Sequence, residues 1–363
     1  MVSVLLAGGG TAGHVNPLLA VAAELRRRDA DVTLRVLGTS EGLEATLVPA
    51  AGLELDLVPR VPLPRRPSLD LVRVPGRLRA AVRAAQEAIE ASGAQVVVGF
   101  GGYVAAPAYL AARRRRVPVV VHEANARPGL ANRMGARWAA AVAVTFPDTP
   151  LRDGVLTGLP LRPEVAELVS ARESDPSRVR REARAALGLD PDRRTVLVTG
   201  GSLGAQSLNR AVAATAVELV ASGAQVIHLT GAGKADEVRA LAPDAHYQVR
   251  EYLTEMHLAY AAADLVVCRA GAGTVSELAA LGLPAVYVPL PIGNGEQRRN
   301  AAGVVAAGGG LLIEDRDLTP AWVREHVVAI QDEELDSMAR AAAGAGIRDG
   351  AARVVDLVEG VLE

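Results

Sequence analysis

The stretch Leu265–Asn300, LVVCRAGAGTVSELAALGLPAVYVPLPIGNGEQRRN, decides the fold. It predicts a short buried strand at Leu265–Cys268, a helix that opens at Thr274 after a glycine turn, and a second strand at Ala285–Val288. A helix that begins just beyond a strand's carboxyl end presents unpaired N–H groups and a positive dipole end, which suits phosphate or pyrophosphate. Thr274–Glu277 also matches a capping box, S/T-x-x-E, which would need no ligand. These residues alone leave both interpretations open.

Composition excludes several classes of protein. The balance of 39 basic against 41 acidic residues gives no global attraction to nucleic acid, so none is expected as a partner. The single cysteine, Cys268, excludes a disulfide framework and a cysteine-based zinc site, which favours a reducing compartment. No run approaches ~18 uninterrupted apolar residues, so no membrane-spanning helix is expected. The apolar start of the chain is too short for the core of a signal peptide.

The first half opens with its own glycine turn. Val2–Ala7 predicts a buried parallel strand, and Gly8–His14 follows with the pattern G-x-G-x-x-G before a helix from about Pro17 to Arg28. A dinucleotide site also needs an acidic residue at the end of the second strand. That strand, Val32–Leu37, is followed by Gly-Thr-Ser instead. NAD binding is therefore disfavoured.

The second half repeats this organisation. Thr195–Thr199 predicts a buried strand, and Gly200–Ala205 forms the next glycine turn before a helix. Strand–helix alternation in both halves predicts an α/β chain with two doubly wound domains, whose parallel sheets face one another across a ligand cleft. The predicted domains are residues 1–158 and 159–344. The last helix, about residues 345–363, is left with two possible places, on the second domain or back on the first.

Seven motifs recur in a recognisable order along nearly the whole chain: Ala7–Pro17 (AGGGTAGHVNP), Gly99–Pro107 (GFGGYVAAP), His122–Asn125 (HEAN), Gly158–Arg162 (GLPLR), Gly200–Gln206 (GGSLGAQ), Arg269–Glu277 (RAGAGTVSE) and Gln297–Ala301 (QRRNA). Any one of them is a weak signal, but the set closely resembles the bacterial MurG family. Members of that family are peptidoglycan UDP-N-acetylglucosamine transferases with the GT-B fold of two Rossmann-like domains.

The resemblance implies an activity and a location. The family moves N-acetylglucosamine, with inversion, from UDP-N-acetylglucosamine (UDP-GlcNAc) to the C4 hydroxyl of lipid I, the undecaprenyl-pyrophosphoryl-N-acetylmuramyl-pentapeptide, and so makes lipid II. It works peripherally at the cytoplasmic face of the membrane, without a cofactor or an active-site metal. Proteins of cell-wall synthesis and division are further partners that the resemblance suggests.

The resemblance also implies site residues. An N-terminal group would face the donor sugar and the acceptor, namely Thr11, Ala12, Gly13 and Asn125, with Arg162 near the domain junction. On the C-terminal domain the UDP-GlcNAc ligands would be Ser202, Leu253, Ala272, Gly273, Thr274, Val275, Ser276, Glu277 and Gln297, with Glu277 on the ribose. The acceptor would meet Gly101, Gly102, Tyr103 and His122.

The acceptor hydroxyl needs a base, and His14 is the candidate. It follows a phosphate-type turn at a helix start, where the helix dipole favours neutral imidazole. A capping or backbone-paired histidine is the alternative, and His122 is the weaker candidate for the base. Two Asp-x-Asp triplets, at residues 190–192 and 315–317, flank turns and are interpreted as solvated loop charges rather than metal ligands.

The segment Arg60–Arg83 carries seven arginines and one acid, with apolar residues between them. Such a surface could dock on anionic lipid, although a core-facing helix with a solvated arginine face is the commoner outcome. Because the implied acceptor is lipid-linked, we expect docking. Two other functions stay open: another GT-B UDP-sugar enzyme, such as an epimerase or a glycolipid synthase, and a non-catalytic nucleotide-binding protein.

Overall fold

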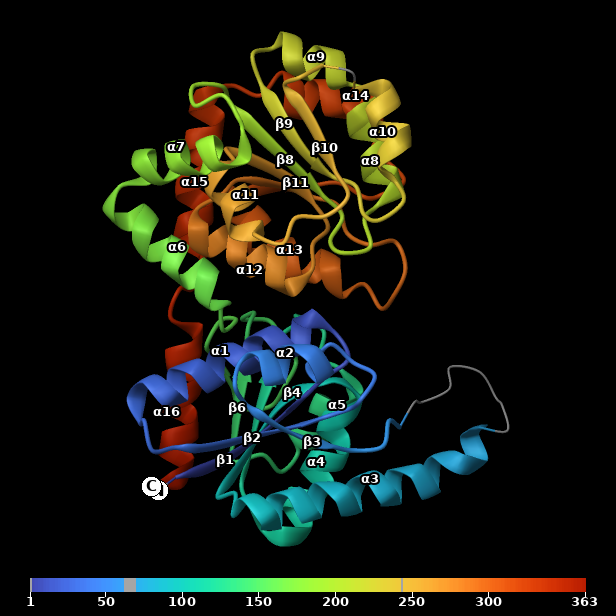
Figure 1. Cartoon of the computed structure of the whole chain (residues 1–363), viewed down its shortest axis with the longest axis vertical. Coiled ribbons are helices and arrows are strands. Elements are labelled where there is room, and N and C mark those ends of the chain that lie inside the picture. Colours follow the sequence, from blue (N-terminus) through green and yellow to red (C-terminus); the bar gives the residue numbers. More distant parts are fainter. Residues whose placement is uncertain (1, 62–69, 243) are drawn as a thin grey trace. The chain divides into compact units, whose positions relative to one another are not determined.

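The computed structural model describes residues 2–61, 70–242 and 244–363, apart from the side chains of residues 70–73. The chain divides into two compact units (Figure 1). Unit 1 comprises Met1–Arg162 and Asp349–Glu363, and unit 2 comprises Pro163–Arg348. The C-terminal helix thus belongs to unit 1.

Unit 1 is built on a seven-stranded parallel sheet in the order β3-β2-β1-β4-β5-β6-β7. Its strands are β1 (Ser3–Gly8), β2 (Thr33–Gly38), β3 (Glu54–Leu57), β4 (Val96–Gly101), β5 (Val119–Glu123), β6 (Ala141–Val144) and β7 (Gly154–Leu156). Its helices are α1 (Ala12–Arg28), α2 (Glu44–Ala50), α3 (Asp70–Ser92), α4 (Gly102–Arg115), α5 (Leu130–Gly135) and α16 (Gly350–Leu362).

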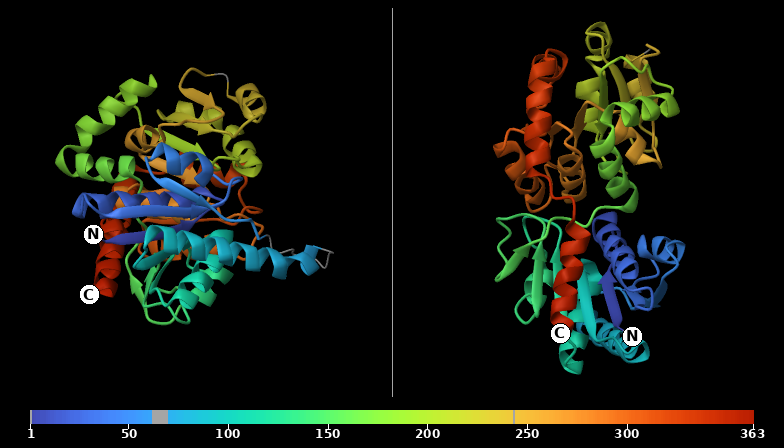
Figure 2. Two further views of the ribbon diagram at one scale, coloured as in Figure 1. Left: turned by 60° about the horizontal axis from the view of Figure 1, so that its bottom comes forward. Right: turned by 90° about the vertical axis from the view of Figure 1, so that its left-hand side faces the viewer.

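Helices cover both faces of this sheet, which is why its central strands are buried throughout. Val4 and Leu6 of β1 pack on one face with α1 and with Val354 and Val358 of α16. Leu5, on the other face, packs with α3 and α4. Figure 2 shows α16 lying along unit 1. The chain's last helix therefore completes the core of the unit in which the chain began.

Unit 2 repeats the plan with a six-stranded parallel sheet in the order β10-β9-β8-β11-β12-β13. Its strands are β8 (Thr195–Thr199), β9 (Gln225–Leu229), β10 (Tyr247–Arg250), β11 (Leu265–Cys268), β12 (Ala285–Tyr287) and β13 (Gly310–Leu312). Its helices are α6 (Pro163–Ser174), α7 (Pro176–Leu187), α8 (Gln206–Ala213), α9 (Ala216–Ala221), α10 (Ala235–Leu241), α11 (Met256–Ala262), α12 (Ala272–Leu281), α13 (Glu296–Ala306), α14 (Pro320–Val323), which continues as the π-helix η1 (Arg324–Val328), and α15 (Asp332–Ala345).

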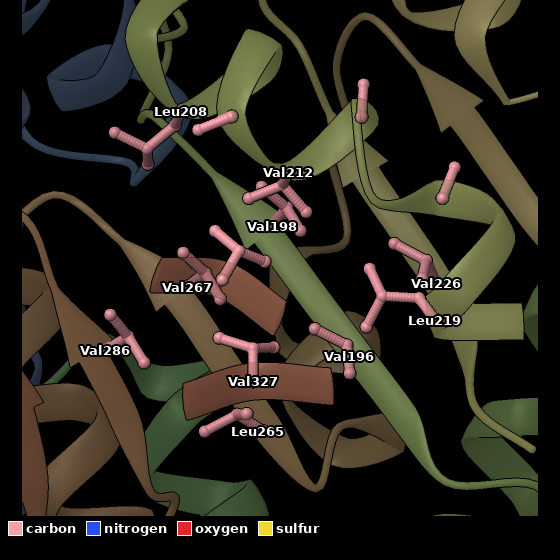
Figure 3. Close-up of a cluster of buried hydrophobic side chains, with 14 of the residues drawn as sticks. Val196, Val198, Leu208, Val212, Leu219, Val226, Leu265, Val267, Val286 and Val327 are labelled. Carbon is pink, nitrogen blue, oxygen red and sulfur yellow. The ribbon is translucent and has the colours of Figure 1, made fainter. Parts of the chain in front are cut away.

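Aliphatic side chains from the central strands make the core of unit 2 (Figure 3). Val196 and Val198 of β8 meet Val267 of β11 and Val226 of β9 there, all of them almost fully buried. The predicted α/β class and the parallel, doubly wound arrangement of both sheets are confirmed.

Several element boundaries differ from the prediction. Helix α1 begins at Ala12 and contains Pro17, whereas the sequence predicted a start at Pro17. Helix α12 begins at Ala272, two residues before the predicted start. Gln297 lies in the first turn of α13, and α6 and β7 were not predicted. Over the described ranges, no helix is both long and apolar enough to cross a membrane.

Candidate active site

The first glycine turn is organised by a buried carboxylate. Glu44, at the start of α2, is 0% exposed and accepts hydrogen bonds from the Gly10 N–H at 2.7 Å and from the Thr39 hydroxyl and N–H at 2.7 and 3.0 Å. A side chain at Gly9 or Gly42 would overlap this carboxylate. Burial by itself raises the pKa of Glu44, but the hydrogen bonds outweigh burial and hold the pKa below its ordinary value.

Glu44 changes the interpretation of the G-x-G-x-x-G turn. In a dinucleotide site the amides of this turn approach a pyrophosphate. Here the Gly10 amide already has an anion, supplied by the chain itself. The turn therefore presents its outer side, at Thr11–Gly13, to solvent.

His14 is the third residue of α1 and is half-buried. Its Nδ1 lies 3.2 Å from the Thr11 hydroxyl. A Cβ atom at Gly101, whose φ is +98°, would lie only 3.0 Å from the imidazole edge, and Gly102 packs on the Gly9 carbonyl in the same way. The predicted residues Gly101 and Gly102 thus pack directly against the imidazole ring of His14.

The charge state of His14 suits a base. Burial lowers the pKa of His14 below its ordinary value of 6.5, while the Gly9 backbone and the Glu44 charge oppose part of that shift. The imidazole is therefore largely neutral at pH 7 and can accept a proton.

His122 closes β5 and is fully buried. Its ring lies 5.5 Å from that of Phe100, and neither ring nitrogen has a hydrogen-bond partner among the described residues. Burial lowers the pKa of His122 to about 4, against an opposing effect of the Gly158 backbone, and the nearby His14 lowers it further. His122 is therefore neutral under all ordinary conditions.

Glu123 fixes the loop that follows His122. Its carboxylate accepts the N–H groups of Asn125 at 2.9 Å and Gly129 at 3.0 Å, and the Asn132 amide at 3.0 Å. Burial raises the pKa of Glu123 above its ordinary value against these bonds. Glu123 belongs to the HEAN motif, but no role was predicted for it. An acid directly after a buried strand, two residues before a candidate ligand, was the available signal.

The other predicted residues of unit 1 lie around the same edge of the sheet. Tyr103 is 44% exposed, and the Arg60 guanidinium lies 5.2 Å from its ring centroid. Arg60 also pairs with Glu41 at 3.1 Å. Arg162, half-buried, is the last residue of the first segment of unit 1.

In unit 2 the second glycine turn follows β8. Gly204 has a φ of +66°, and a side chain there would overlap the Thr230 carbonyl, so the turn packs tightly on the end of β9. The Lys234 ammonium donates to the Leu203 carbonyl at 2.6 Å. Ser202 remains exposed at the tip. The packing of Gly204 on Thr230 and the Lys234–Leu203 hydrogen bond fix the position of this turn.

Helix α12 starts beside that turn, because β8 and β11 are neighbours at the point where the strand order reverses. Its N-cap is Gly271, which makes no side-chain cap. Thr274 is already the third helical residue, so the capping-box interpretation of Thr274–Glu277 is wrong. Cβ atoms built at Gly271 and Gly273 meet nothing within 4 Å. The first turn of α12 thus has open space before its amides, at the usual ligand position of an open α/β sheet.

The remaining predicted donor ligands lie near this edge of unit 2. Val275, Ser276 and Glu277 continue α12, and Glu277 is 7% exposed. Leu253 is half-buried after β10. Gln297 accepts the Leu290 N–H at 3.0 Å through Oε1, and its amide nitrogen, with the second lone pair of Oε1, remains to hold a sugar hydroxyl.

Asp315 contradicts the interpretation of the second Asp-x-Asp triplet as solvated charge. It forms an ion pair with Arg269 at 2.5 Å and accepts from the Ser207 hydroxyl at 2.5 Å. Arg269 in turn donates to the Val288 and Pro289 carbonyls. This network ties β11, α8 and the loop after β12 together. Within the described part of the chain, no group of three or more His, Cys, Asp or Glu side chains could hold a metal ion.

Comparisons with known proteins identify the family. Residues 4–144 match the glycosyltransferase family 28 N-terminal domain, and residues 195–354 match the C-terminal domain of the same family. A relative from a Nocardioides species is 56% identical over 98% of this chain and 97% of its own length. A relative from Clavibacter sepedonicus is 57% identical over 99% and 96%. Both are named UDP-N-acetylglucosamine–N-acetylmuramyl-(pentapeptide) pyrophosphoryl-undecaprenol N-acetylglucosamine transferase.

The chain belongs to glycosyltransferase family 28. The crystal structure of Acinetobacter baumannii MurG, 29% identical, superposes with a TM-score of 0.78 over 99% of this chain and all of that one. The predicted resemblance to MurG and the GT-B fold are both confirmed. As a family 28 enzyme, the chain places its two glycine turns in the two domains that the family models separate.

Proposed function

We propose that this chain transfers N-acetylglucosamine from UDP-GlcNAc to the C4 hydroxyl of lipid I, with inversion, and so forms lipid II. The observation that carries the proposal is the identity of 56% over 98% of the chain to a relative named for this transfer. The match covers both domains.

In this proposal the donor binds on unit 2. The pyrophosphate lies against the first turn of α12 at Ala272–Thr274 and the turn around Ser202, and the amides at the helix start, which have no partner within the helix, favour its charge. Glu277, one turn further into α12, accepts the ribose hydroxyls, and Gln297 holds the sugar through its amide nitrogen. Leu253 offers its backbone to the uracil.

The chemistry needs a base and a stabilised leaving group. His14 takes the proton of the acceptor hydroxyl as that oxygen attacks the anomeric carbon. The bond from that carbon to the β-phosphate breaks, and UDP leaves with the electron pair. The amides that begin α12 stabilise the developing charge on UDP, so the residues themselves supply the electrostatics of the step.

The test is transfer of radiolabelled sugar from UDP-GlcNAc to a short-chain lipid I analogue, with a chelator present. Labelled disaccharide product is expected. Failure to form product, or a strict requirement for a divalent ion, contradicts the proposal. Release of free UDP with an altered sugar would instead favour an epimerase, and donor binding without turnover would favour a nucleotide-binding protein.

Membrane docking is a separate part of the proposal. Of the basic segment, Arg65 and Arg66 lie outside the described residues, whereas Arg79 and Arg83 are exposed on α3. Val74 and Leu78 of α3 pack on the core of unit 1, which removes them from a lipid-facing surface. We place the enzyme peripherally at the cytoplasmic face of the membrane, held mainly by the arginines, each contributing about 1 kcal/mol near an anionic surface.

Vesicle sedimentation tests this docking. Replacing Arg79 and Arg83 with Gln should weaken binding to anionic vesicles, and salt should weaken the unmodified protein in the same way. Replacing Arg152 and Arg181, which are exposed elsewhere, serves as the matched control. Equal binding of both double variants contradicts the role of α3.

A further inference from the structure

A cavity of about 520 Å³ lies in unit 2, at the edge of the sheet where the strands begin. Arg194 and Asp264, which immediately precede β8 and β11, line it, and so do Arg172 of α6 and Arg180 and Arg184 of α7. This edge is opposite to the one that carries the glycine turns. The cavity is therefore distinct from the donor site proposed above. A ligand bound in it would not depend on the proposed transferase function.

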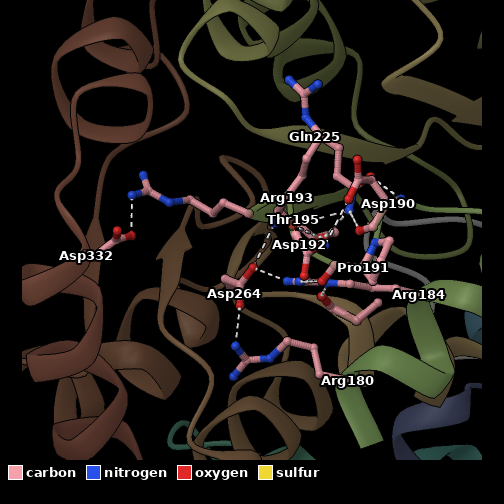
Figure 4. A network of polar contacts seen from close by, with 12 residues as sticks. Arg180, Arg184, Asp190, Pro191, Asp192, Arg193, Thr195, Gln225, Asp264 and Asp332 are labelled. Atoms are coloured by element: carbon pink, nitrogen blue, oxygen red, sulfur yellow. Dashed lines mark hydrogen bonds and ion pairs between the residues drawn. The ribbon is translucent and has the colours of Figure 1, made fainter. Parts of the chain in front are cut away.

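Two guanidinium groups, those of Arg180 and Arg184, bind one carboxylate in this cavity (Figure 4), and Arg172 lines the same cavity. Asp264 accepts from Arg184 at 2.5 Å and from the Thr195 N–H at 2.7 Å, and it pairs with Arg180 at 3.2 Å. Both of its oxygens are thus occupied. The Arg172 guanidinium has no ion pair or hydrogen bond among the described residues, so it is the arginine of this group that lacks a carboxylate partner.

Helix ends explain some of the arginines at this edge but not all. The carbonyl ends of helices attract cations. Arg184 donates to the Ala262 carbonyl at the end of α11, and Arg193 donates to the Val220 and Gly223 carbonyls at the end of α9. Arg194 is paired with Asp332 and donates to the Ile330 carbonyl. Arg172 and Arg180 are left without such an explanation.

These two side chains also carry buried donors without acceptors. Arg172 Nη1 and Arg180 Nε are buried and have no hydrogen-bond partner among the described residues. Burial and the charge of Arg180 lower the pKa of Arg172 to about 10, against the opposing charge of Asp264. A buried donor without an acceptor is costly, and more so on a charged group. An oxyanion in the cavity would lie beside both guanidinium groups, which line it.

We propose that this cavity binds an oxyanion of the phosphate class, held by Arg172 and Arg180. Planar guanidinium groups bind phosphate oxygens in pairs. The other acids that line the cavity do not fill that role, because Asp332 pairs with Arg194 and Asp192 and Asp336 are exposed to solvent. The volume is in the range of small-molecule sites, so the phosphate can be part of a larger molecule.

Calorimetric titration of inorganic phosphate into the full chain tests the proposal, at constant ionic strength in a phosphate-free chloride buffer. One phosphate should bind per chain. Arg172→Gln and Arg180→Gln should each weaken that binding by about tenfold or more, as loss of a charged hydrogen bond implies. Arg181→Gln, the same change at an exposed residue of α7, is the matched control and should leave it unchanged.

Thermal unfolding separates a ligand role from a structural one. Arg172→Gln should be at least as stable as the unmodified protein without phosphate, because it removes a charged group with an unpartnered buried donor. Phosphate should raise the melting temperature of the unmodified protein and of Arg181→Gln, but not that of Arg172→Gln. Absence of phosphate binding, or equal binding by all three variants, overturns the proposal.

A second arm identifies the source of the phosphate. Vesicles that carry phosphatidic acid are sedimented with the protein and with Arg172→Gln. Weaker retention of the variant assigns the phosphate to a lipid headgroup, and equal retention assigns it to a soluble molecule.

Discussion

The two glycine turns look alike in the sequence, but Glu44 makes the first differ from the second in structure. Its carboxylate receives the Gly10 amide and both donors of Thr39, so the first turn is shaped from within. In the second turn the Gly201 amide donates instead to a neutral acceptor, the Thr199 hydroxyl, at 3.2 Å. This difference gives a physical reason to place the donor phosphates on unit 2 and the base on unit 1. Glu44 acts through His14 and Gly10, so it is a positioning residue.

Replacing Glu44 with Gln should therefore affect both stability and the pH profile. The amide nitrogen of Gln cannot accept the bonds that the carboxylate accepts, so the free energy of unfolding of unit 1 should fall by about 1–3 kcal/mol. Loss of the negative charge should lower the pKa of His14 further and move the acid limb of kcat/KM to lower pH. Glu54→Gln, a surface neutralisation in the same unit, should leave the limb in place. If the acid limb of kcat/KM does not move in Glu44→Gln, Glu44 does not influence the catalytic base.

His14 itself gives the sharpest test at this scale. If it is the base, His14→Ala should lower turnover by about 10²–10⁴ while UDP-GlcNAc still binds. In the unmodified enzyme, kcat/KM should decline only below the ordinary histidine value of 6.5, because burial lowers the pKa of His14. His246→Ala, at a half-buried histidine of unit 2, is the control. An unchanged rate in His14→Ala assigns the base to another group.

At the scale of helices and strands, the sequence predicted elements best where apolar runs are bounded by turn residues. Strands β8 and β11 have the predicted bounds. Helix starts were less predictable. Gly271, not Thr274, caps α12, because a glycine with an extended backbone conformation there lets the helix begin directly from the strand end. The spacing of Thr274 and Glu277 matches a capping box in the sequence although both residues lie inside the helix.

The candidate site was predictable in its motifs but not in its supports. Glu44 meets Gly10 across 34 residues of sequence, and Asp315 meets Arg269 across a comparable gap. Local patterns of turn and helix residues do not encode such partners, because only the packing of the sheet brings them together. His14, Gly101 and Gly102, which follow two neighbouring strands, could be grouped from sequence since parallel strands end at one edge.

The first turn of α12 allows an element-scale prediction. Gly273 has open space around it and an ordinary helical backbone, so Gly273→Ala should leave the unfolding free energy unchanged or raise it by up to about 1 kcal/mol. Its methyl group would nevertheless stand before the amides proposed for pyrophosphate. The KM for UDP-GlcNAc should rise about tenfold or more, the loss of roughly one charged hydrogen bond.

Two other glycines calibrate that result. Gly344→Ala, in α15 with equally open surroundings, should change neither KM nor fold. Gly204→Ala should destabilise unit 2, because the new Cβ would overlap the Thr230 carbonyl at a φ of +66°. A normal KM in Gly273→Ala moves the pyrophosphate away from α12.

At the scale of the whole molecule, the two units can be followed separately. The chain has two tryptophans, Trp138 in unit 1 and Trp322 in unit 2. Trp138→Phe therefore leaves a fluorescence signal for unit 2 alone. Each unit also contains a buried neutral histidine, His122 in unit 1 and His228 in unit 2. Acid should thus destabilise both units by the same mechanism, protonation of a buried histidine on unfolding. The two tryptophans allow the two effects to be measured separately.

Unit 2 offers the simpler case. In unit 1 the raised pKa of Glu123 opposes the acid sensitivity of His122, because a carboxyl that binds its proton more tightly when folded gains stability as pH falls. His228 has no such counterpart in its surroundings. It bonds Tyr247 at 2.8 Å and Asn209 at 3.1 Å, and burial lowers its pKa to about 3.

The sign of the effect follows from linkage. Above pH 6.5 His228 is neutral in both folded and unfolded chains and adds no pH dependence. Between pH 6.5 and about pH 3 only the unfolded chain binds the proton, so the free energy of unfolding falls as pH falls, by about 1.4 kcal/mol per pH unit. Urea unfolding of Trp138→Phe should show a loss of about 2 kcal/mol between pH 6.5 and pH 5. His228→Gln in the same background should flatten that slope, even if its stability at pH 7 is lower, whereas His246→Gln should keep it. A slope that survives in His228→Gln would place the acid sensitivity of unit 2 elsewhere.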